Sequence, residues 1–184
     1  MGCREFFQSN LENKEPCKLL QNLSSDKQLA WEAESASEYS PGPVSNSEEL
    51  CRHVLNPVHF DLQNNTIKPS FFDDASGKGA SVNRLFYTNI EQIRKAAQAR
   101  VDMSNKNPPN SGLRKLIGYS SVTANEVREI FTGMPPRRAM AVYDTAKSDD
   151  SSHADICQLV KTKVMEKSVR VQLYWLAKNR LILF

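Results

Sequence analysis

The clearest hydrophobic pattern in the chain lies in its middle. Apolar residues recur there at close to helical spacing, at Ile90, Ile93, Ala97 and Val101, and the residues between them are mostly charged or amide-bearing. Such a stripe is typical of a helix that packs one face on a core. Asn89, directly before it, is a favoured cap because its side-chain oxygen accepts a backbone hydrogen bond. The pattern predicts an amphipathic helix that begins after Asn89.

Two further helices are predicted in the C-terminal half. Thr123 followed three residues later by Glu126 has the sequence of a capping box, in which each side chain bonds the backbone amide of the other residue. This predicts a helix that stops at Gly133, a residue type that commonly follows helix ends. Apolar residues recur at helical spacing again over roughly residues 165–179, which predicts a longer helix.

A short helix is also predicted over residues 51–55. Asn46 and Glu49 have the residue types and the spacing of a helix-capping pair. Pro57 would end this helix, because the residue before a proline disfavours helical backbone angles.

Apolar runs between these helices predict short strands. The predicted strands cover residues 80–86, 116–122 and 139–143, and residues 154–160 are predicted to form a strand or a turn. Strands that alternate with helices indicate an α+β, or mixed α/β, layer fold. We therefore expect residues 46–184 to form one compact domain with short strands and three or four helices.

Residues 1–45 are predicted to be a loosely attached N-terminal segment. Prolines, a glycine and several serines between residues 35 and 43 break any periodicity and indicate a linker. Chain termini are commonly held loosely, which favours a flexible tail. The alternative is a helical arm that docks on a partner through Phe6, Phe7 and Trp31.

Composition and charge narrow the class of protein only slightly. The net charge of +3 and the isoelectric point near 8.7 permit an anionic partner without demanding one. Dedicated nucleic-acid binders concentrate Lys and Arg on one face. Basic pairs such as Arg137-Arg138 make nucleic acid a possible partner, but few aromatic residues lie near them to stack on bases.

The sequence also indicates a compartment. No apolar run approaches the ~20 residues that a membrane-spanning helix needs. The start of the chain has no apolar stretch like that of a signal peptide, and the four cysteines are scattered rather than dense as in secreted disulfide scaffolds. These features predict a cytoplasmic protein with reduced thiols and no membrane partner.

Four basic or imidazole side chains are the candidates for ligand binding: Arg52, His53, Arg84 and His153. The guanidinium of arginine fits phosphate and carboxylate groups, and histidine transfers protons near neutral pH. We expect the four to converge on one cleft that binds an anion or a nucleotide. The alternative is that the arginines pair with neighbouring aspartates and serve the fold.

A metal site is a weaker candidate. Cys51 and His53 are close in sequence, and His153, Asp155 and Cys157 alternate, so that a strand would place these three on one face. Two thiolates and two imidazoles suit zinc. The spacings match no familiar structural zinc site, and a buried cysteine is commonly a small hydrophobic residue. Zinc is therefore possible but not favoured.

Short motifs between residues 50 and 157 resemble those of a small uncharacterised bacterial domain. They are Arg52-His53-x3-Pro57-x2-Phe60, Pro69-x2-Phe72, Ser81-Val82-Asn83-Arg84 and His153-Ala154-Asp155-Ile156. This resemblance implies no established activity. The opening Leu50-x-Arg52-His53-x3-Pro57 also resembles, more distantly, the start of RNA 2′-phosphotransferases, which have an ADP-ribosyltransferase-like domain. That resemblance implies NAD as a possible cofactor.

Two functional hypotheses follow. The leading one is a small cytoplasmic binding or accessory domain that acts with a protein partner, or as a homo-oligomer, through its N-terminal arm or its C-terminal helix. It rests on apolar ends and on the lack of a strong catalytic signature. The alternative is an ADP-ribosyltransferase-like enzyme, or another enzyme acting on nucleotides or nucleic acids, that uses an Arg/His cleft.

Overall fold

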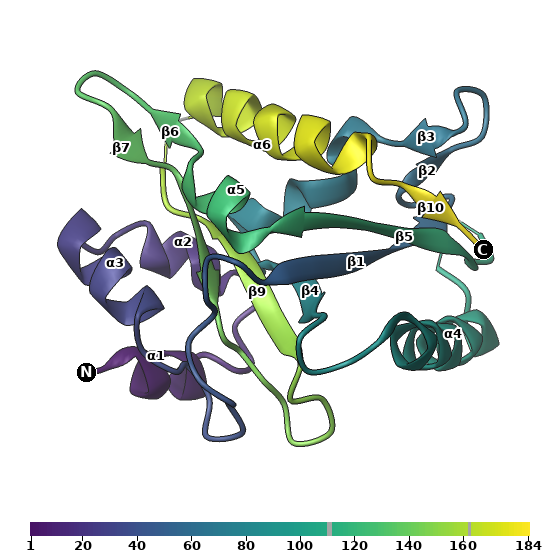
Figure 1. The fold of residues 1–184 in the computed structure, drawn as a ribbon, viewed down its shortest axis with the longest axis horizontal. Coiled ribbons are helices and arrows are strands. Elements are labelled where there is room, and N and C mark those ends of the chain that lie inside the picture. Colours follow the sequence, from purple (N-terminus) through teal and green to yellow (C-terminus); the bar gives the residue numbers. More distant parts are fainter. Residues whose placement is uncertain (110–111, 162) are drawn as a thin grey trace.

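The fold is built on one antiparallel sheet of six strands in the order β10-β5-β1-β4-β9-β8 (Figure 1). The structure is a computed structural model that describes residues 1–109, 112–161 and 163–184, apart from the side chains of residues 163–167. The sheet strands are β1 (Glu49–Asn56), β4 (Ala80–Arg84), β5 (Lys115–Thr123), β8 (Met140–Tyr143), β9 (His153–Gln158) and β10 (Ile182–Leu183). Two small hairpins pair β2 (Phe60–Asp61) with β3 (Thr66–Ile67) and β6 (Phe131–Thr132) with β7 (Arg137–Arg138).

Helices cover both faces of the sheet. They are α1 (Cys3–Ser9), α2 (Pro16–Leu20), α3 (Ser25–Glu32), the 3-10 helix η1 (Pro69–Ser76), α4 (Ile90–Lys106), α5 (Ala124–Arg128) and α6 (Lys163–Lys178). Helices α6 and η1 lie over one face and α4 and α1 over the other, with the chain ends at opposite sides of the molecule (Figure 1). This arrangement confirms the predicted α+β fold. No helix in the described residues is both long and apolar enough to cross a membrane.

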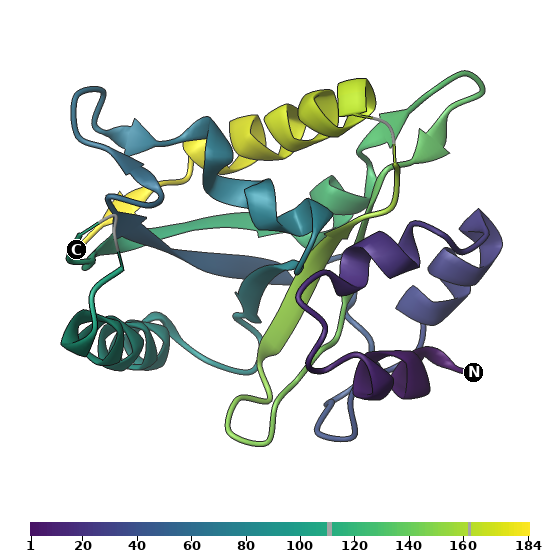
Figure 2. The same cartoon turned by 180° about the vertical axis from the view of Figure 1, so that it is seen from behind.

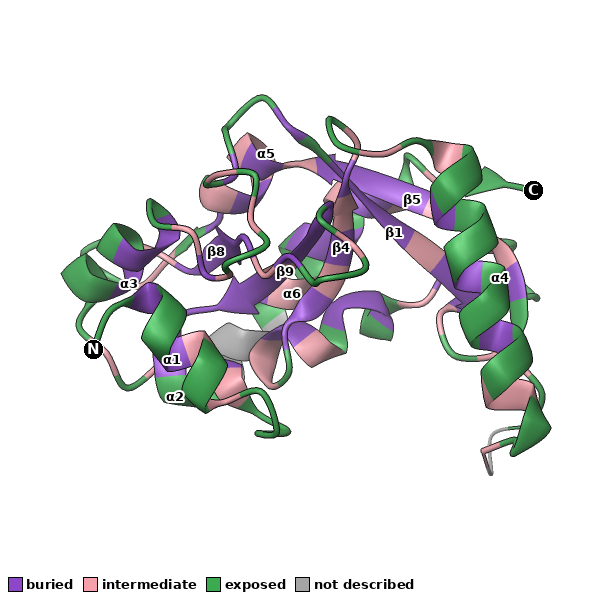
Figure 3. Cartoon of the chain, turned by 90° about the horizontal axis from the view of Figure 1, so that it is seen from below, coloured by how far each residue is buried: buried purple, intermediate pink, exposed green. Residues whose placement is uncertain are grey.

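The strand register fixes which residues share a face. Leu50 lies opposite Arg84, and Cys51 opposite Asn83, which in turn lies opposite His153. Directly paired residues point to the same side of a sheet, and consecutive residues point to opposite sides. The core under α6, η1 and α5 therefore contains the even-numbered residues of β1 and β4, such as Leu50 and Val82. Figure 3 views the opposite face, which α1 and α4 cover.

The helix caps at Asn89 and Thr123 are as predicted. Asn89 Oδ1 accepts a hydrogen bond from the backbone of Gln92, and Thr123 and Glu126 form the capping box. The helix that Thr123 opens is shorter than predicted, because it ends at Arg128 and residues from Phe131 form the β6–β7 hairpin. Gly133 has a φ of +85° and lies in the turn of that hairpin instead of after a helix.

The predicted helix over residues 51–55 is wrong, because these residues form the centre of β1. The side chains expected to cap it bond to distant residues instead. Asn46 Oδ1 accepts from Arg128 and Glu49 Oε1 accepts from Ser121. Pairing with β5 and β4 on both sides satisfies the backbone, so long-range contacts override the local signal.

The N-terminal segment is packed against the sheet, which corrects the prediction of a loose attachment. Phe6 and Trp31 are buried in a cluster that also contains Tyr143 of β8 and Cys157 of β9. Figure 2 shows α1–α3 beside the edge of the sheet that β8 and β9 form. Because Phe6 and Trp31 are buried inside the chain, they are not available to dock on a partner. A partner at the C-terminal helix stays a prediction.

Candidate functional site

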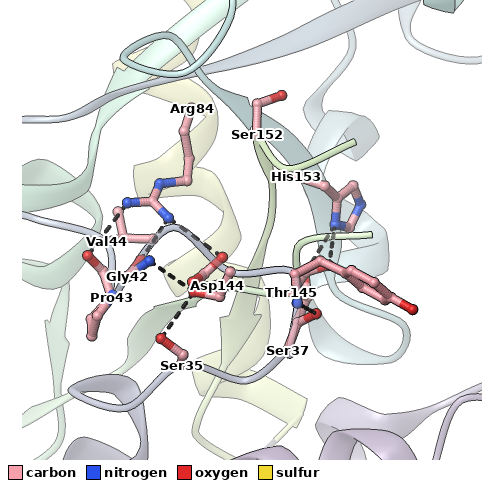
Figure 4. Close-up of polar contacts among 12 residues, drawn as sticks. Ser35, Ser37, Gly42, Pro43, Val44, Arg84, Asp144, Thr145, Ser152 and His153 are labelled. Atoms are coloured by element: carbon pink, nitrogen blue, oxygen red, sulfur yellow. Dashed lines mark hydrogen bonds and ion pairs between the residues drawn. The ribbon is translucent and has the colours of Figure 1, made fainter. Parts of the chain in front are cut away.

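Arg84 is buried at the end of β4 and bonds to groups of the protein itself. It is fully buried, and its Nε and NH2 donate to the two carboxylate oxygens of Glu48 at 2.6 and 2.8 Å. NH1 donates to the carbonyl of Gly42 at 2.7 Å and lies 3.4 Å from Asp144 Oδ1 (Figure 4). Burial raises the pKa of Glu48, but the bonds from Arg84 and other donors hold it below its ordinary value. Burial, opposed by Arg84, raises the pKa of Asp144 to about 6.

Arg52 also bonds to groups of the protein itself. Its NH2 donates to Asp74 Oδ2 at 2.7 Å and its NH1 to the carbonyl of Ser81 at 3.0 Å. The guanidinium also lies over the rings of Phe71 and Phe72. These contacts hold η1 against β1 and β4. They agree with the alternative prediction that the arginines pair with neighbouring aspartates and serve the fold.

His53 lies on the face of the sheet covered by α4. Burial, followed by the charges of Arg52 and Arg100, lowers its pKa to about 4. Its ring is 6.5 Å from that of His59, whose pKa burial lowers to about 3. His59 Nδ1 accepts a hydrogen bond from the backbone of Leu55. Both rings are therefore neutral near pH 7.

The prediction that the four side chains converge on one cleft is wrong. Arg52 and His53 are consecutive on β1, so they point to opposite faces. By the register, Arg84 shares the face of Arg52, whereas His153 shares that of His53. A strand assignment for residues 49–56 would have shown this separation in advance. Any role of Arg52, His53 or Arg84 in ligand binding stays a prediction.

The metal-site candidates do not assemble either. His153, Asp155 and Cys157 do lie on one face of β9, as the alternation predicted. However, Cys157 contacts Cys17 of α2, and Cys51 pairs across the sheet with Asn83. Within the described ranges, no three His, Cys, Asp or Glu side chains gather in a way that could hold a metal ion.

His153 lies at a cavity between the N-terminal segment and the β8–β9 connection. The cavity has a volume of about 480 Å³. One side consists of α1 with the chain that follows it and of residues 36–39, and the other of residues 145–148 together with His153 and Asp155. None of Arg52, His53 and Arg84 lines it. The packed N-terminal segment thus forms one wall of a hollow that the sheet alone would not have.

The hydrogen bonds of His153 fix its tautomer. Its Nδ1 lies 3.0 Å from both the carbonyl and the hydroxyl oxygen of Thr145 (Figure 4). A carbonyl only accepts, so Nδ1 carries a proton, and in the neutral ring Nε2 then has the free lone pair. The Thr145 hydroxyl in turn donates to Asp155 Oδ2 at 2.7 Å. His153 is 4 % exposed, and its buried Nε2 has no hydrogen-bond partner among the residues that the structure describes.

The polar end of the cavity is consequently rich in acceptors. The hydroxyl groups that bond to Asp155 are already donating, Thr145 to one of its oxygens and Ser81 to the other at 3.1 Å. Each carboxylate oxygen has a second lone pair, and His153 Nε2 has its own. The walls include apolar groups, among them Phe7 and Leu11. This arrangement accepts hydrogen bonds at one end and packs an apolar group at the other.

His153, Asp155 and Phe7 were singled out from the sequence, but not as members of one site, and Thr145 and Tyr39 were not singled out. Thr145 had no local signal, since an isolated threonine in a polar loop is ordinary. Phe7 and Tyr39 were placed in the N-terminal segment, and only its docking brings them to the cavity.

Comparison of the chain with protein-family models, with curated proteins and with solved structures finds no match in any of the three. The two resemblances suggested by the sequence motifs therefore stay predictions. The geometry of the cavity is the basis for a functional assignment.

Proposed function

We propose that this protein is a binding domain for a small organic molecule, which enters the cavity beside His153 and donates hydrogen bonds to its polar end. The observation that carries this proposal is the buried, unpartnered Nε2 of His153. A buried acceptor without a partner costs about 1–3 kcal/mol, so proteins retain few of them. A donor group of a ligand would remove that cost.

The lining of the cavity defines the chemistry of the ligand. His153 and Asp155 can accept hydrogen bonds from hydroxyl or amine donors of a ligand, because the hydroxyls of Thr145 and Ser81 already donate to Asp155. Phe7, Leu11 and Tyr39 suit an apolar or aromatic body. The volume of about 480 Å³ lies within the range of roughly 300–1,000 Å³ usual for small-molecule sites. Nucleosides and aromatic amines both meet these requirements.

The alternative hypothesis from the sequence is a protein that acts on nucleotides. Under that hypothesis the ligand in this cavity is a nucleotide. Lys78 and Lys147 line the cavity, and neither side chain has an ion-pair partner in the described part of the chain. Their ammonium groups would pair with a phosphate. The ribose hydroxyls would then face His153. This version predicts that nucleotides bind more tightly than the matching nucleosides.

The test is a thermal-shift screen followed by calorimetric titration. The panel contains nucleosides, nucleotides including NAD, aromatic amines, and analogues that lack the donor group. A ligand about 100-fold above its Kd adds about 2.7 kcal/mol to the stability of the folded state. For a chain of this size that raises the melting temperature by roughly 5–10 °C. Donor-free analogues should give no shift.

Two variants separate specific binding from general effects. His153→Phe removes the acceptor and should abolish the response, while Thr145→Val removes the hydroxyl that holds the ring and should weaken it. Thr132→Val, in the β6–β7 hairpin, is the matched control and should respond like the wild type. Ligand responses that persist in His153→Phe would contradict the proposal, as would a panel in which nothing binds.

A further inference from the structure

Two cysteines that are distant in the sequence meet beneath the N-terminal segment. Cys17 lies in α2 and Cys157 in β9, and their sulfur atoms are 2.8 Å apart. Both residues are buried, and all four cysteines of the chain are free thiols. We propose that Cys17 and Cys157 form a disulfide when the protein meets a hydroperoxide, so that α2 becomes covalently fixed to the sheet.

The geometry supports a bond between these two sulfurs. A disulfide bond is about 2.05 Å long, so the sulfurs need to move together by less than about 1 Å. The elements that carry them are already held together, because the backbone amide of Cys17 donates to Gly77 and Gln21 donates to the carbonyl of Gln158. In the described residues no other pair of cysteine sulfurs is in contact. The site is therefore specific to one pair.

The reaction balances with one equivalent of hydroperoxide. One thiolate attacks the peroxide oxygen, which breaks the O–O bond and gives a sulfenic acid and water, or an alcohol from an organic peroxide. The second thiolate then attacks that sulfur and displaces the hydroxide, which leaves with a proton as water. The two thiols lose two protons and two electrons in total, and the peroxide gains them.

Burial controls when this reaction occurs. It raises the pKa of the Cys157 thiol, which disfavours the reactive thiolate while the segment is closed. Oxidation therefore requires the N-terminal segment to lift from the sheet, and the new bond then keeps it closed. Pro16, next to Cys17, lines the cavity, and His153 lies on the same strand as Cys157. The cross-link would thus fix one wall of the cavity against the other.

The experiment treats the reduced full-length protein with hydrogen peroxide and maps its peptides by mass spectrometry without reduction. We expect the Cys17 peptide linked to the Cys157 peptide, with the intact chain lighter by two hydrogen atoms. The melting temperature should rise by roughly 10 °C, since closing a loop of this length stabilises the fold. Reduction should reverse both changes. This result is independent of whether any ligand binds.

Control variants make the outcome decisive. Cys17→Ser and Cys17→Ala should each abolish the linked peptide, whereas Cys3→Ser and Cys51→Ser should retain it. The same peroxide treatment of urea-unfolded protein shows that the reagent oxidises the thiols. If the folded protein keeps four free thiols under those conditions, or if Cys3 or Cys51 cross-links as readily as Cys17, the proposal is overturned.

Discussion

Arg84 shows what a single buried charge does in this fold. It joins three separate segments, at Gly42, Glu48 and Asp144, to the end of β4. Burying a guanidinium is unfavourable unless it is paired and hydrogen-bonded. Its bonds to a carboxylate and a carbonyl supply that pairing. Arg84 therefore connects the linker before β1 to the sheet.

Replacing Arg84 should destabilise the protein strongly. Arg84→Met leaves the carboxylates of Glu48 and Asp144 buried without their cation, and breaking a buried pair in this way costs about 3–5 kcal/mol. Urea unfolding measures the loss. Arg4→Met, at an exposed position, is the control and should change stability by less than about 0.5 kcal/mol. A similarly small loss in Arg84→Met would show that the network does not hold the linker.

Two half-buried histidines, His53 and His59, predict a pH dependence. Burial lowers the pKa of His53 to about 4 and of His59 to about 3, from an ordinary value of 6.5. At these two residues the unfolded chain binds more protons than the folded one below pH 6.5, so their contribution to stability falls as pH drops from 6.5 toward 4. Urea unfolding across this range should show a shallower fall for His59→Gln. Identical slopes for the variant and the wild type would contradict the assignment.

At the scale of single elements, β10 depends on one glycine. Gly118 of β5 lies opposite Leu183, and an added Cβ at residue 118 would collide with the carbonyl oxygen of Ile182. Glycine inside a strand commonly marks such a close approach of another backbone. The final strand of the sheet therefore pairs only because residue 118 has no side chain.

Gly118→Ala should displace β10 and lower stability by about 1–3 kcal/mol, the usual cost of overpacking. Gly77→Ala is the matched control, because the nearest atom to its added Cβ is a flexible side-chain atom of Glu15 at 3.6 Å. Hydrogen exchange of the Phe184 amide, which donates to Ile117, reports the pairing directly. Unchanged protection in Gly118→Ala would contradict this account.

Elements with local signals were predictable from the sequence, and those set by distant contacts were not. The α4 cap at Asn89 lies within a few residues of the group it bonds, so the pattern contains it. The capping signal at Asn46 was misleading, because in the folded chain Asn46 Oδ1 accepts a hydrogen bond from the distant Arg128 and caps no helix. The residues of the candidate site also fall into a group that the sequence predicted and a group that it did not. Alternation placed His153 and Asp155 on one face, but nothing local indicated Thr145 or the N-terminal wall.

At the scale of the whole molecule, the N-terminal segment completes the fold. Its buried residues cover Ala141, Tyr143 and Cys157 on the sheet. Without it, this part of the sheet would expose apolar surface to water. The same packing forms one wall of the cavity, so the stability of the fold and the shape of the cavity both depend on the N-terminal segment.

Phe6→Ala tests that contact. Phe6 is 5 % exposed and packs against Trp31, so its truncation should cost about 3–5 kcal/mol. Phe86→Ala, at a position that is 79 % exposed, should stay within about 0.5 kcal/mol of the wild type. Thermal and urea unfolding measure both. Equal, small effects would mean that the segment is held loosely after all.

In the proposed binding mode, a donor group of the ligand contacts the free lone pair on His153 Nε2. Long-range proton–nitrogen NMR of the imidazole rings, with and without the best ligand of the screen, measures this directly. We predict that Nδ1 of His153 carries the proton in the free protein, and that the Nε2 resonance shifts on binding while those of His53 and His59 do not. A proton on Nε2 in the free protein, or a bound ligand that leaves the Nε2 resonance unchanged, would contradict the account.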